Sequence, residues 1–501
     1  MKITDPLTAE AVSPEVTDIL IVGSGFAGIT MATQLRRSGR RSFLILERAD
    51  DVGGTWRDNN YPGAQVDVAS PLYSLSFGAG FDWSRLNAYQ PEIWQHQKTV
   101  FANEGLTEHF RPSTEVLRAE WDDHANRWTV ETTRGTFVAR VLITAAGHLS
   151  DPKMPDLPGL DRFEGEIFHS AQWRHEFSVD GKRVGVIGTG ASAVQVVPAI
   201  ADVTEHLIVF QRSAAWCAPK RDREFTLAER RMFQRMPETF QALRAELYWT
   251  LESSVPQRHM VEGALDRIRT IAQEHLAAQV ADPELRRKLT PDYEIGCKRI
   301  LRTDDYYPAL CRPDVTLETA PIVEVTSTGI RTPERLHALD VLVMCTGFEA
   351  TDLPIAHRIV GRQDVSLHEY WDRGERAFAT TSMHGFPNLF FMNGPNAGLG
   401  VGSVVDVIET QASYIRGAID WMEARHAETI EVDAKAEDDY VAGIEARMNG
   451  TVWLAGGCSS WYVDPRSGKV TTLWPDFVSR FRMENGTFDP AAYHFRARQD
   501  A

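Results

Sequence analysis

The stretch "DILIVGSGFAGITMATQL" (residues 18–35) decides the fold of the first part of the chain. Its apolar run at 18–22 predicts a buried strand, the glycines after it predict a tight turn, and residues 29–39 have the composition of a helix. A second apolar run, "SFLILE" at residues 42–47, predicts the next strand. Strand, glycine turn, helix and strand in this order are typical of a Rossmann-like α/β unit that binds a dinucleotide.

The turn at residues 23–28 has the spacing G-x-G-x-x-G. We expect Gly23 to permit the tight turn, Gly25 to let a pyrophosphate approach the backbone, and Gly28 to let the helix pack closely on the strand. Phe26 and Ala27 stand at the start of the helix, where backbone amides and the helix dipole favour phosphate groups.

The same pattern returns in "RVGVIGTGASAVQVVPAIA" (183–201) followed by "HLIVFQR" (206–212). This second unit predicts a second nucleotide site, with Ala193 in place of the third glycine. Glycines and a proline break its long uncharged run, which argues against a membrane span. The expected cofactor contacts are Gly188, Thr189, Gly190, Ala191, Ser192 and Gln195.

The residue that ends the second strand of each unit distinguishes the two nucleotides. Glu47 stands 24 residues after Gly23, and Arg212 stands 24 residues after Gly188. A carboxylate there accepts hydrogen bonds from a ribose diol, whereas an arginine pairs with a 2′-phosphate. The first unit therefore predicts FAD, and the second predicts NADPH rather than NADH, with Ser213 next to Arg212 as a further contact.

The pattern along the chain predicts two interleaved domains. Apolar alternation at 127–144 favours a β-meander, and residues 222–290, rich in Glu, Arg, Leu, Ala and Met, favour inserted helices. We expect residues 1–150 to form the first part of an FAD-binding domain and residues 151–335 an NADP-binding domain that carries the insert. Residues 336–501 complete the FAD-binding domain and add a Trp-rich closing segment.

Composition narrows the function classes. The formal net charge of −16 disfavours a nucleic-acid or anionic-membrane partner. The polar segment at residues 1–18 lacks the apolar core of a secretory signal, and we expect a cytoplasmic protein. Five cysteines without a CxxC pair predict reduced thiols, and they argue against a dithiol–disulfide reductase and against a zinc or other metal site.

The string "FEGEIFHSAQW" (163–173) lies between the two units and fits F-x-G-x-x-x-H-x-x-x-W through Phe163, Gly165, His169 and Trp173. It resembles the motif of the type I Baeyer–Villiger monooxygenases, class B flavoproteins related to the flavin-containing monooxygenases. Arg174 departs from the Pro or Asp that usually follows in that family. Blocks similar to those of the family follow in the family order at 52–70, 295–300, 339–348, 385–397 and 457–477.

This resemblance implies an FAD-dependent NADPH monooxygenase that converts a ketone to an ester or lactone through a flavin peroxide. It implies that Arg299 is the active-site cation and Asp67 its carboxylate partner, which also contacts the cofactor. Thr55, Trp56 and Asn393 are expected to contact FAD, and Lys298 is expected to join the NADPH phosphate site. The linker string is expected to orient the domains, with backbone freedom from Gly165 and anchoring by His169 and Trp173.

Two other readings stay open. An N- or S-oxygenating flavin monooxygenase would use the same cofactors, and a Baeyer–Villiger enzyme can itself oxidise sulfides. A non-oxygenating NADPH-dependent redox flavoprotein would keep both nucleotide sites and lack oxygen insertion. Trp461 and Tyr462 either line the substrate side or only pack, and the Gly-rich segment at 394–403 is expected near the flavin ring. The sequence names neither the ketone nor an obligatory protein partner.

Overall fold

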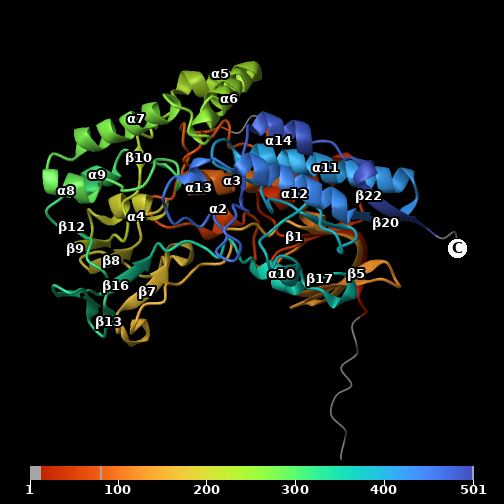
Figure 1. The fold of residues 1–501 in the computed structure, drawn as a ribbon, viewed down its shortest axis with the longest axis horizontal. Helices are drawn as coiled ribbons and strands as arrows, with labels where there is room; N and C mark the ends of the chain where they lie inside the picture. Colours follow the sequence, from red (N-terminus) through yellow and green to blue (C-terminus); the bar gives the residue numbers. More distant parts are fainter. Residues whose placement is uncertain (1–12, 79–81, 499–501) are drawn as a thin grey trace, which may run out of the picture.

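The computed structural model describes residues 13–78 and 82–498. The strands form two groups, one around β8, β9 and β16 and one around β1, β5 and β17, and a layer of helices lies over them (Figure 1). Most of the polar N-terminal segment, for which the sequence predicts no secretory signal, lies outside the described residues.

The first sheet has eight strands in the order β17-β4-β5-β6-β1-β2-β3, with β18 also paired to β6. β1 pairs in parallel with β2 and β6, whereas β4, β5 and β6 are antiparallel, which confirms the predicted meander. The last two strands come from the chain beyond residue 350, so this domain is built from two separate parts of the sequence. The strands are β1 Glu15–Val22, β2 Phe43–Leu46, β3 Phe110–Arg111, β4 Val116–Asp122, β5 Arg127–Thr132, β6 Gly135–Thr144, β17 Ile359–Val360 and β18 Leu389–Phe391.

Apolar side chains cover both faces of this sheet. On one face, α1 (Phe26–Arg37), α3 (Gln90–Asn103) and α11 (Val404–Ala424) bury a core that includes Ile21, Ile29 and Ile415. The other face is closed by Trp128, Leu142 and by aromatic residues of the later segment. Burial of this area is the main favourable term that holds the two parts of the domain together.

The second sheet has five parallel strands in the order β12-β9-β8-β16-β7. Its strands are β7 Glu166–His169, β8 Arg183–Ile187, β9 His206–Phe210, β12 Val315–Glu318 and β16 Val341–Met344, covered by α4 (Ala193–Ile200) and α9 (Tyr306–Leu310). The run at 184–201 is thus a strand, a turn and a short helix, as predicted. The boundary expected at 335/336 cuts this sheet, because β16 pairs with β7 and β8, and we propose that the domain ends after Met344.

The helical insert is confirmed. It consists of α5 Leu227–Arg235, α6 Pro237–Glu252, α7 Ala264–Gln279 and α8 Pro283–Lys288. In Figure 1, α5, α6 and α7 lie along the top of the molecule and α8 lies at its left edge. Thr226 and Glu229 form a capping box at the start of α5. The Arg244 guanidinium donates to the carbonyls of Pro71 and Ser74, so the insert of the second domain is docked on the first.

The C-terminal part adds α12 (Ala434–Met448), α13 (Val452–Ala455), α14 (Val478–Asn485) and the antiparallel pair β20 (Ala427–Val432) and β22 (Tyr493–Ala497). The prediction of five reduced cysteines is wrong, because Cys297 and Cys458 form a disulfide. Their 161-residue separation hid the pair, since spacing along the chain reveals only cysteines that are close in sequence. Cys217, Cys311 and Cys345 are free thiols.

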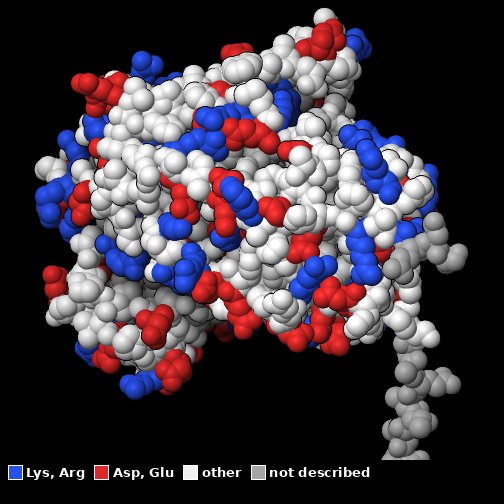
Figure 2. Space-filling model, turned by 45° about the vertical axis from the view of Figure 1, so that its right-hand side comes forward, with Lys and Arg blue, Asp and Glu red and all other residues white. Residues whose placement is uncertain are grey.

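Charge is mixed on the visible surface. Figure 2 shows acidic and basic side chains interspersed over one face of the molecule, so the net charge of −16 is not gathered there in one patch. Within residues 13–78 and 82–498, no helix is both long and apolar enough to cross a membrane.

Candidate active site

A cavity lies at the carboxyl ends of β1 and β6. Gly23 turns the chain there with φ +104°, and a Cβ on it would stand 2.6 Å from the Ala145 carbonyl oxygen. A Cβ on Gly28 would stand 2.0 Å from the Gly23 carbonyl oxygen, so only glycine permits this close packing of helix on strand. Both roles predicted for these glycines are confirmed.

The start of α1 is open toward the cavity. Gly25 is the N-cap residue and no side chain caps the helix, although Gly25, Phe26 and Ala27 line the cavity. The first-turn amides of a helix have no partner within the helix, so these amides are available to an anionic ligand. A cofactor with a pyrophosphate fits this cradle.

Glu47 lines the same cavity and is only 5% exposed. One carboxylate oxygen accepts hydrogen bonds from the Ser24 amide and hydroxyl at 3.1 and 2.7 Å. The other accepts from the Ala49 amide at 2.9 Å and pairs with Arg57 at 3.1 Å. Glu47 therefore also fixes the glycine turn, and a ribose diol would replace one of these donors, of which the Ser24 hydroxyl is the freest to rotate.

The opposite wall carries a polar atom without a protein partner. The Asn393 side-chain oxygen is buried and accepts no hydrogen bond within the described residues, while its nitrogen lies 3.3 Å from His148 Nδ1. Thr55 and Trp56 of α2 (Thr55–Asp58) line the cavity, and the Trp56 indole donates to the Tyr73 hydroxyl at 3.1 Å. An unsatisfied buried acceptor beside an open helix start fits FAD, which offers both donors and phosphates.

The second glycine turn repeats the geometry of the first. Gly188 has φ +116°, and a Cβ on it would stand 2.4 Å from the Cys345 carbonyl oxygen at the end of β16. A Cβ on Gly190 would meet nothing within 4 Å, so a ligand can approach the backbone there. Ala191 and Ser192 continue the turn into α4, and the Thr189 hydroxyl donates to the Ser213 carbonyl oxygen at 2.8 Å.

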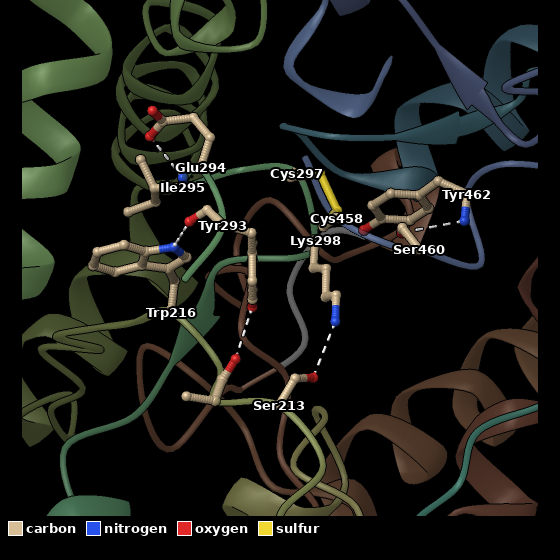
Figure 3. The surroundings of a disulfide bond; sticks show 11 residues. Ser213, Trp216, Tyr293, Glu294, Ile295, Cys297, Lys298, Cys458, Ser460 and Tyr462 are labelled. Atoms are coloured by element: carbon tan, nitrogen blue, oxygen red, sulfur yellow. Dashed lines mark hydrogen bonds between the residues drawn. A yellow bond between two sulfur atoms is a disulfide. The ribbon is translucent and has the colours of Figure 1, made fainter. Parts of the chain in front are cut away.

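Two cations meet beside this turn. Lys298 Nζ donates to the Ser213 hydroxyl at 3.1 Å, and the side chain points toward Ser213 and away from the disulfide in Figure 3. Burial and the nearby positive charge of Arg212 lower the pKa of Lys298. Lys298 and Arg212 lie close enough for their charges to interact, and two such cations form a site suited to a phosphate group.

The cofactor contact predicted for Gln195 stays a prediction, and its side chain lies at the joint between the two domains. Its side-chain oxygen accepts from the Tyr61 hydroxyl at 3.0 Å, and its nitrogen donates to the Gln65 carbonyl at 2.7 Å. Its amide therefore joins the second domain to the first, and we propose an interdomain role for it. One residue in the sequence that relates to this contact is Gly63, because a Cβ added there would stand 2.5 Å from the Gln195 carbonyl oxygen.

Arg299 and Asp67 form a bidentate ion pair across 232 residues of sequence. The guanidinium donates to both carboxylate oxygens at 2.7–3.0 Å. Burial alone would raise the pKa of Asp67, but the adjacent guanidinium outweighs it and lowers that pKa, and Asp67 in turn raises the pKa of Arg299. The Arg299 side chain stays 46% exposed and that of Asp67 19%, so the cation, not the carboxylate, faces open space.

The sequence did not single out two residues that surround this pair. Tyr73 lines the first cavity and its electrostatic neighbours include Asp67 and Arg299, while burial raises its pKa to about 12. Burial lowers the pKa of Lys220 to about 8, against the attraction of Asp222 and Asp67. Tyr73 therefore lies between the cavity and the Arg299–Asp67 pair. No short-range sequence pattern reveals this position.

The linker string lies at the joint between the domains. His169 ends β7, is 1% exposed, and its ring lies 5.7 Å from the ring of Phe348, in the segment that leads from β16 back to β17 of the first domain. Trp173 is buried edge-on against Phe168 at 4.9 Å, and Phe163 lies in the core beneath the second sheet. The prediction that Gly165 supplies backbone freedom is wrong, because its φ is not positive. Glycine is needed there for space, since a Cβ would stand 2.4 Å from the Asp340 carbonyl oxygen.

Known proteins share this architecture. Residues 20–247 match the family described as pyridine nucleotide-disulphide oxidoreductase. A Baeyer-Villiger monooxygenase of Streptomyces coelicolor is 42% identical over 95% of this chain and 92% of its own length. The crystal structure of cyclohexanone monooxygenase from Rhodococcus sp. Phi1 bound to NADP+ is 29% identical, covers 97% of this chain and all of that one, and gives a TM-score of 0.87. OTEMO in complex with FAD and NADP, 27% identical over 97% of this chain and all of that one, gives 0.85.

Proposed function

Because the chain belongs to the Baeyer–Villiger monooxygenases, we propose that it uses NADPH and O2 to convert a small ketone into an ester or lactone. The observation that carries the proposal is the Arg299–Asp67 ion pair, which holds a permanent cation in open space next to the wall of the first cavity. The cofactors are FAD and NADP. When bound, FAD accepts a hydride from NADPH and supplies the chemistry that activates oxygen.

The chain's own residues orient the two nucleotides. The open start of α1 and the buried acceptor of Asn393 support FAD binding in the first cavity. Gly190 leaves the second turn open, and the cations Arg212 and Lys298 at Ser213 support binding of a 2′-phosphate. The contacts of Gln195 with Tyr61 and Gln65 hold the second turn against the first domain, so that both nucleotides serve one reaction site.

Arg299 supplies the fixed charge that oxygen insertion into a ketone needs. Negative charge develops on oxygen during this reaction, and a preorganised cation stabilises it without reorganisation at that moment. The two-point hydrogen bond to Asp67 fixes the guanidinium plane, and the lowered pKa of Asp67 keeps the carboxylate charged at neutral pH. We assign Arg299 as the catalytic cation and Asp67 as the residue that positions it.

A cytoplasmic location stays a prediction, because the sequence argument for it is untested. Cell fractionation with antibodies against the chain would check it. The disulfide is the one feature that bears against a constantly reducing compartment, since most such bonds persist only in oxidising surroundings.

Product analysis over a mixed panel tests the function. The purified holoenzyme would receive NADPH with linear, cyclic and aromatic ketones, thioethers and amines, and NADPH loss, hydrogen peroxide and products by mass spectrometry would be measured together. We expect esters or lactones from at least one ketone class, with NADPH loss that depends on oxygen. Oxygenated amines or sulfides without any ester would favour the N- or S-oxygenating alternative. NADPH loss without any oxygenated product would favour a non-oxygenating flavoprotein.

A further inference from the structure

We propose that the Cys297–Cys458 disulfide is a redox-controlled clamp on the active site, opened by a dithiol reductant. It fastens the tail segment, residues 457–463, to the segment at 293–300 that carries Lys298 and Arg299. The predicted effect on catalysis rests on the proposed function, whereas the bond and the mobility of the tail segment can be tested without turnover.

The disulfide joins two segments that both carry site residues. Cys297 is fully buried and directly precedes Lys298 and Arg299. Cys458 lies three residues before Trp461 and four before Tyr462. Figure 3 shows the yellow S–S bond between the irregular segment that carries Lys298 and the loop that carries Ser460 and Tyr462. The bond therefore couples the position of the catalytic arginine to that of an aromatic segment.

Tyr462 is the other contact through which the tail segment reaches the site. It is 3% exposed, and its electrostatic neighbours are Arg299, Arg258 and Asp67. Trp461, at 45% exposure, packs against Tyr462 with ring centroids 4.5 Å apart and ring planes tilted by 55°, and its ring lies 6.3 Å from the ring of His148. The segment thus forms an aromatic wall between the Arg299–Asp67 ion pair and His148. The residues on either side of His148 in the sequence, Gly147 and Leu149, line the first cavity.

Few other bonds hold this segment. Among the described residues, Gly457, Cys458 and Ser459 make no backbone hydrogen bond, and residues 457–460 belong to no helix or strand. The hydrogen bonds that flank these three residues run from the Glu294 amide to the Gly456 carbonyl at 3.0 Å and from the Val463 amide to the Ser460 carbonyl at 3.2 Å. Farther along the segment, the Tyr462 carbonyl accepts from the Thr472 hydroxyl at 3.3 Å, and Val463 pairs with Val470. A segment with so few bonds opens at low cost once its covalent tie is lost.

The chemistry of opening is ordinary thiol–disulfide exchange. One thiolate of a dithiol attacks the Cys458 sulfur, which is on the partly exposed side, the S–S bond breaks, and Cys297 leaves and takes up a proton. The second thiolate of the reductant then displaces Cys458, which is protonated in turn, and the reductant becomes a cyclic disulfide. Two electrons and two protons pass to the protein. In reducing compartments, disulfides that do form are usually transient and catalytic or redox-sensing.

We expect reduction to uncouple the enzyme. With the clamp open, Trp461 and Tyr462 lose their fixed position, water gains access to the Arg299 pair, and NADPH is still consumed. The ester formed per NADPH should fall by about tenfold, with a matching rise in hydrogen peroxide, because small misplacements in an active site cost that much or more. Reoxidation should restore the coupling.

The test compares wild type, Cys458→Ser and Cys297→Ala, with Cys311→Ser as control because Cys311 is an exposed free thiol that does not belong to the pair. Alkylation of the unfolded holoenzyme, read by mass spectrometry, should find three thiols before dithiol treatment and five after it. Limited proteolysis should cut residues 457–461 only in the reduced wild type and in the two pair variants. Ester per NADPH should fall in the same samples, while Cys311→Ser behaves as wild type in every assay.

Three outcomes would overturn the proposal. Five alkylated thiols in untreated protein would mean that the pair does not form. Equal proteolysis and equal coupling with and without the bond would make it a structural tie without control over the site. Opening of the bond by NADPH alone would make the pair an electron acceptor reached through the flavin, not a clamp. If no ketone is oxygenated at all, the alkylation and proteolysis results still decide the clamp, and only the proposed function fails.

Discussion

At the residue scale, Arg299 separates two steps that share one site. Hydride transfer to the flavin needs no cation for developing negative charge on oxygen, whereas insertion into the ketone does. We predict that Arg299→Ala binds FAD and oxidises NADPH but loses about two to three decades in ester formation. Asp67→Ala should lose less, since it positions the guanidinium. Parallel measurement of NADPH, hydrogen peroxide and ester checks this, and an unchanged ester yield in Arg299→Ala would disprove the catalytic assignment.

Arg212 tests the nucleotide assignment. We predict that Arg212→Ala reduces the preference for NADPH over NADH by roughly 1–3 kcal/mol, because one charge-assisted contact with the 2′-phosphate is lost. Lys298→Ala should act in the same direction, since both cations meet at Ser213. The ratio of kcat/KM for the two nucleotides is the measurement. The control is Arg174→Ala, which removes a surface arginine paired with Glu166 and Glu176. An equal change of the kcat/KM ratio in this control would disprove the assignment of Arg212 to the 2′-phosphate.

The buried carboxyl of Glu375 should make the free energy of unfolding depend on pH. Burial raises the pKa of its carboxyl to about 8, with Asp464 and Asp352 adding to the shift against the attraction of Arg466. Between the ordinary pKa and about 8, the folded state keeps a proton that the unfolded state releases, so stability falls as pH rises through this window. Below this window the Glu375 carboxyl is protonated in both the folded and the unfolded state, so its ionisation costs no stability.

Glu375→Gln should therefore stabilise the protein at pH 8.5 and have little effect at pH 5. The neutral amide keeps the shape of the protonated acid and removes the cost of ionisation, which is at most ~5 kcal/mol for a shift of this size. Thermal unfolding across this pH range is the measurement, with the exposed Glu164→Gln as control. A stabilisation of equal size at pH 5 would mean that Glu375 is not protonated in the folded state.

At the element scale, the two glycine turns are built alike but tolerate change differently. We predict that Gly28→Ala prevents FAD retention and lowers stability, because its Cβ would overlap the Gly23 carbonyl and push α1 off β1. Gly190→Ala should fold normally, because its Cβ meets no protein atom within 4 Å, yet raise the KM for NADPH by crowding the phosphate approach. Flavin content, thermal unfolding and NADPH kinetics separate the two. Normal NADPH kinetics in Gly190→Ala would show that the pyrophosphate does not pass there.

At the scale of the whole molecule, function depends on how the two domains meet. Gly63 lies in the first domain with φ +81°, and its position against the Gln195 carbonyl leaves no room for a Cβ. We predict that Gly63→Ala slows reduction of the flavin by NADPH while FAD binding and reduction by dithionite stay normal, because the second domain is displaced. Stopped-flow flavin absorbance measures both reductions.

Gly39→Ala is the matched control for this variant. Its φ of +89° imposes a similar backbone strain, but nothing lies within 4 Å of the position and no interdomain contact is near it. Slow reduction by NADPH in both variants would attribute the effect to backbone strain and not to the domain joint.

The sequence by itself determined the two βαβ units, the strands that end in Glu47 and Arg212, the β-meander and the helical insert. These features are local, because apolar periodicity, a glycine turn and the residue at a strand end are all written within some thirty residues. The pairing of Asp67 with Arg299 could be predicted only from the family resemblance, since 232 residues separate the two.

Only the tertiary structure decided which distant groups meet. It paired Cys297 with Cys458 where odd count and wide spacing favoured free thiols. It brought the Gln195 side chain to Tyr61 and Gln65, whereas the cofactor contact that the motif predicts for Gln195 stays a prediction. It also paired β16 with β8, which supports our proposal that the second domain ends after Met344. Each of these contacts joins segments that are far apart in the sequence, and such contacts leave no periodic mark in the chain between them.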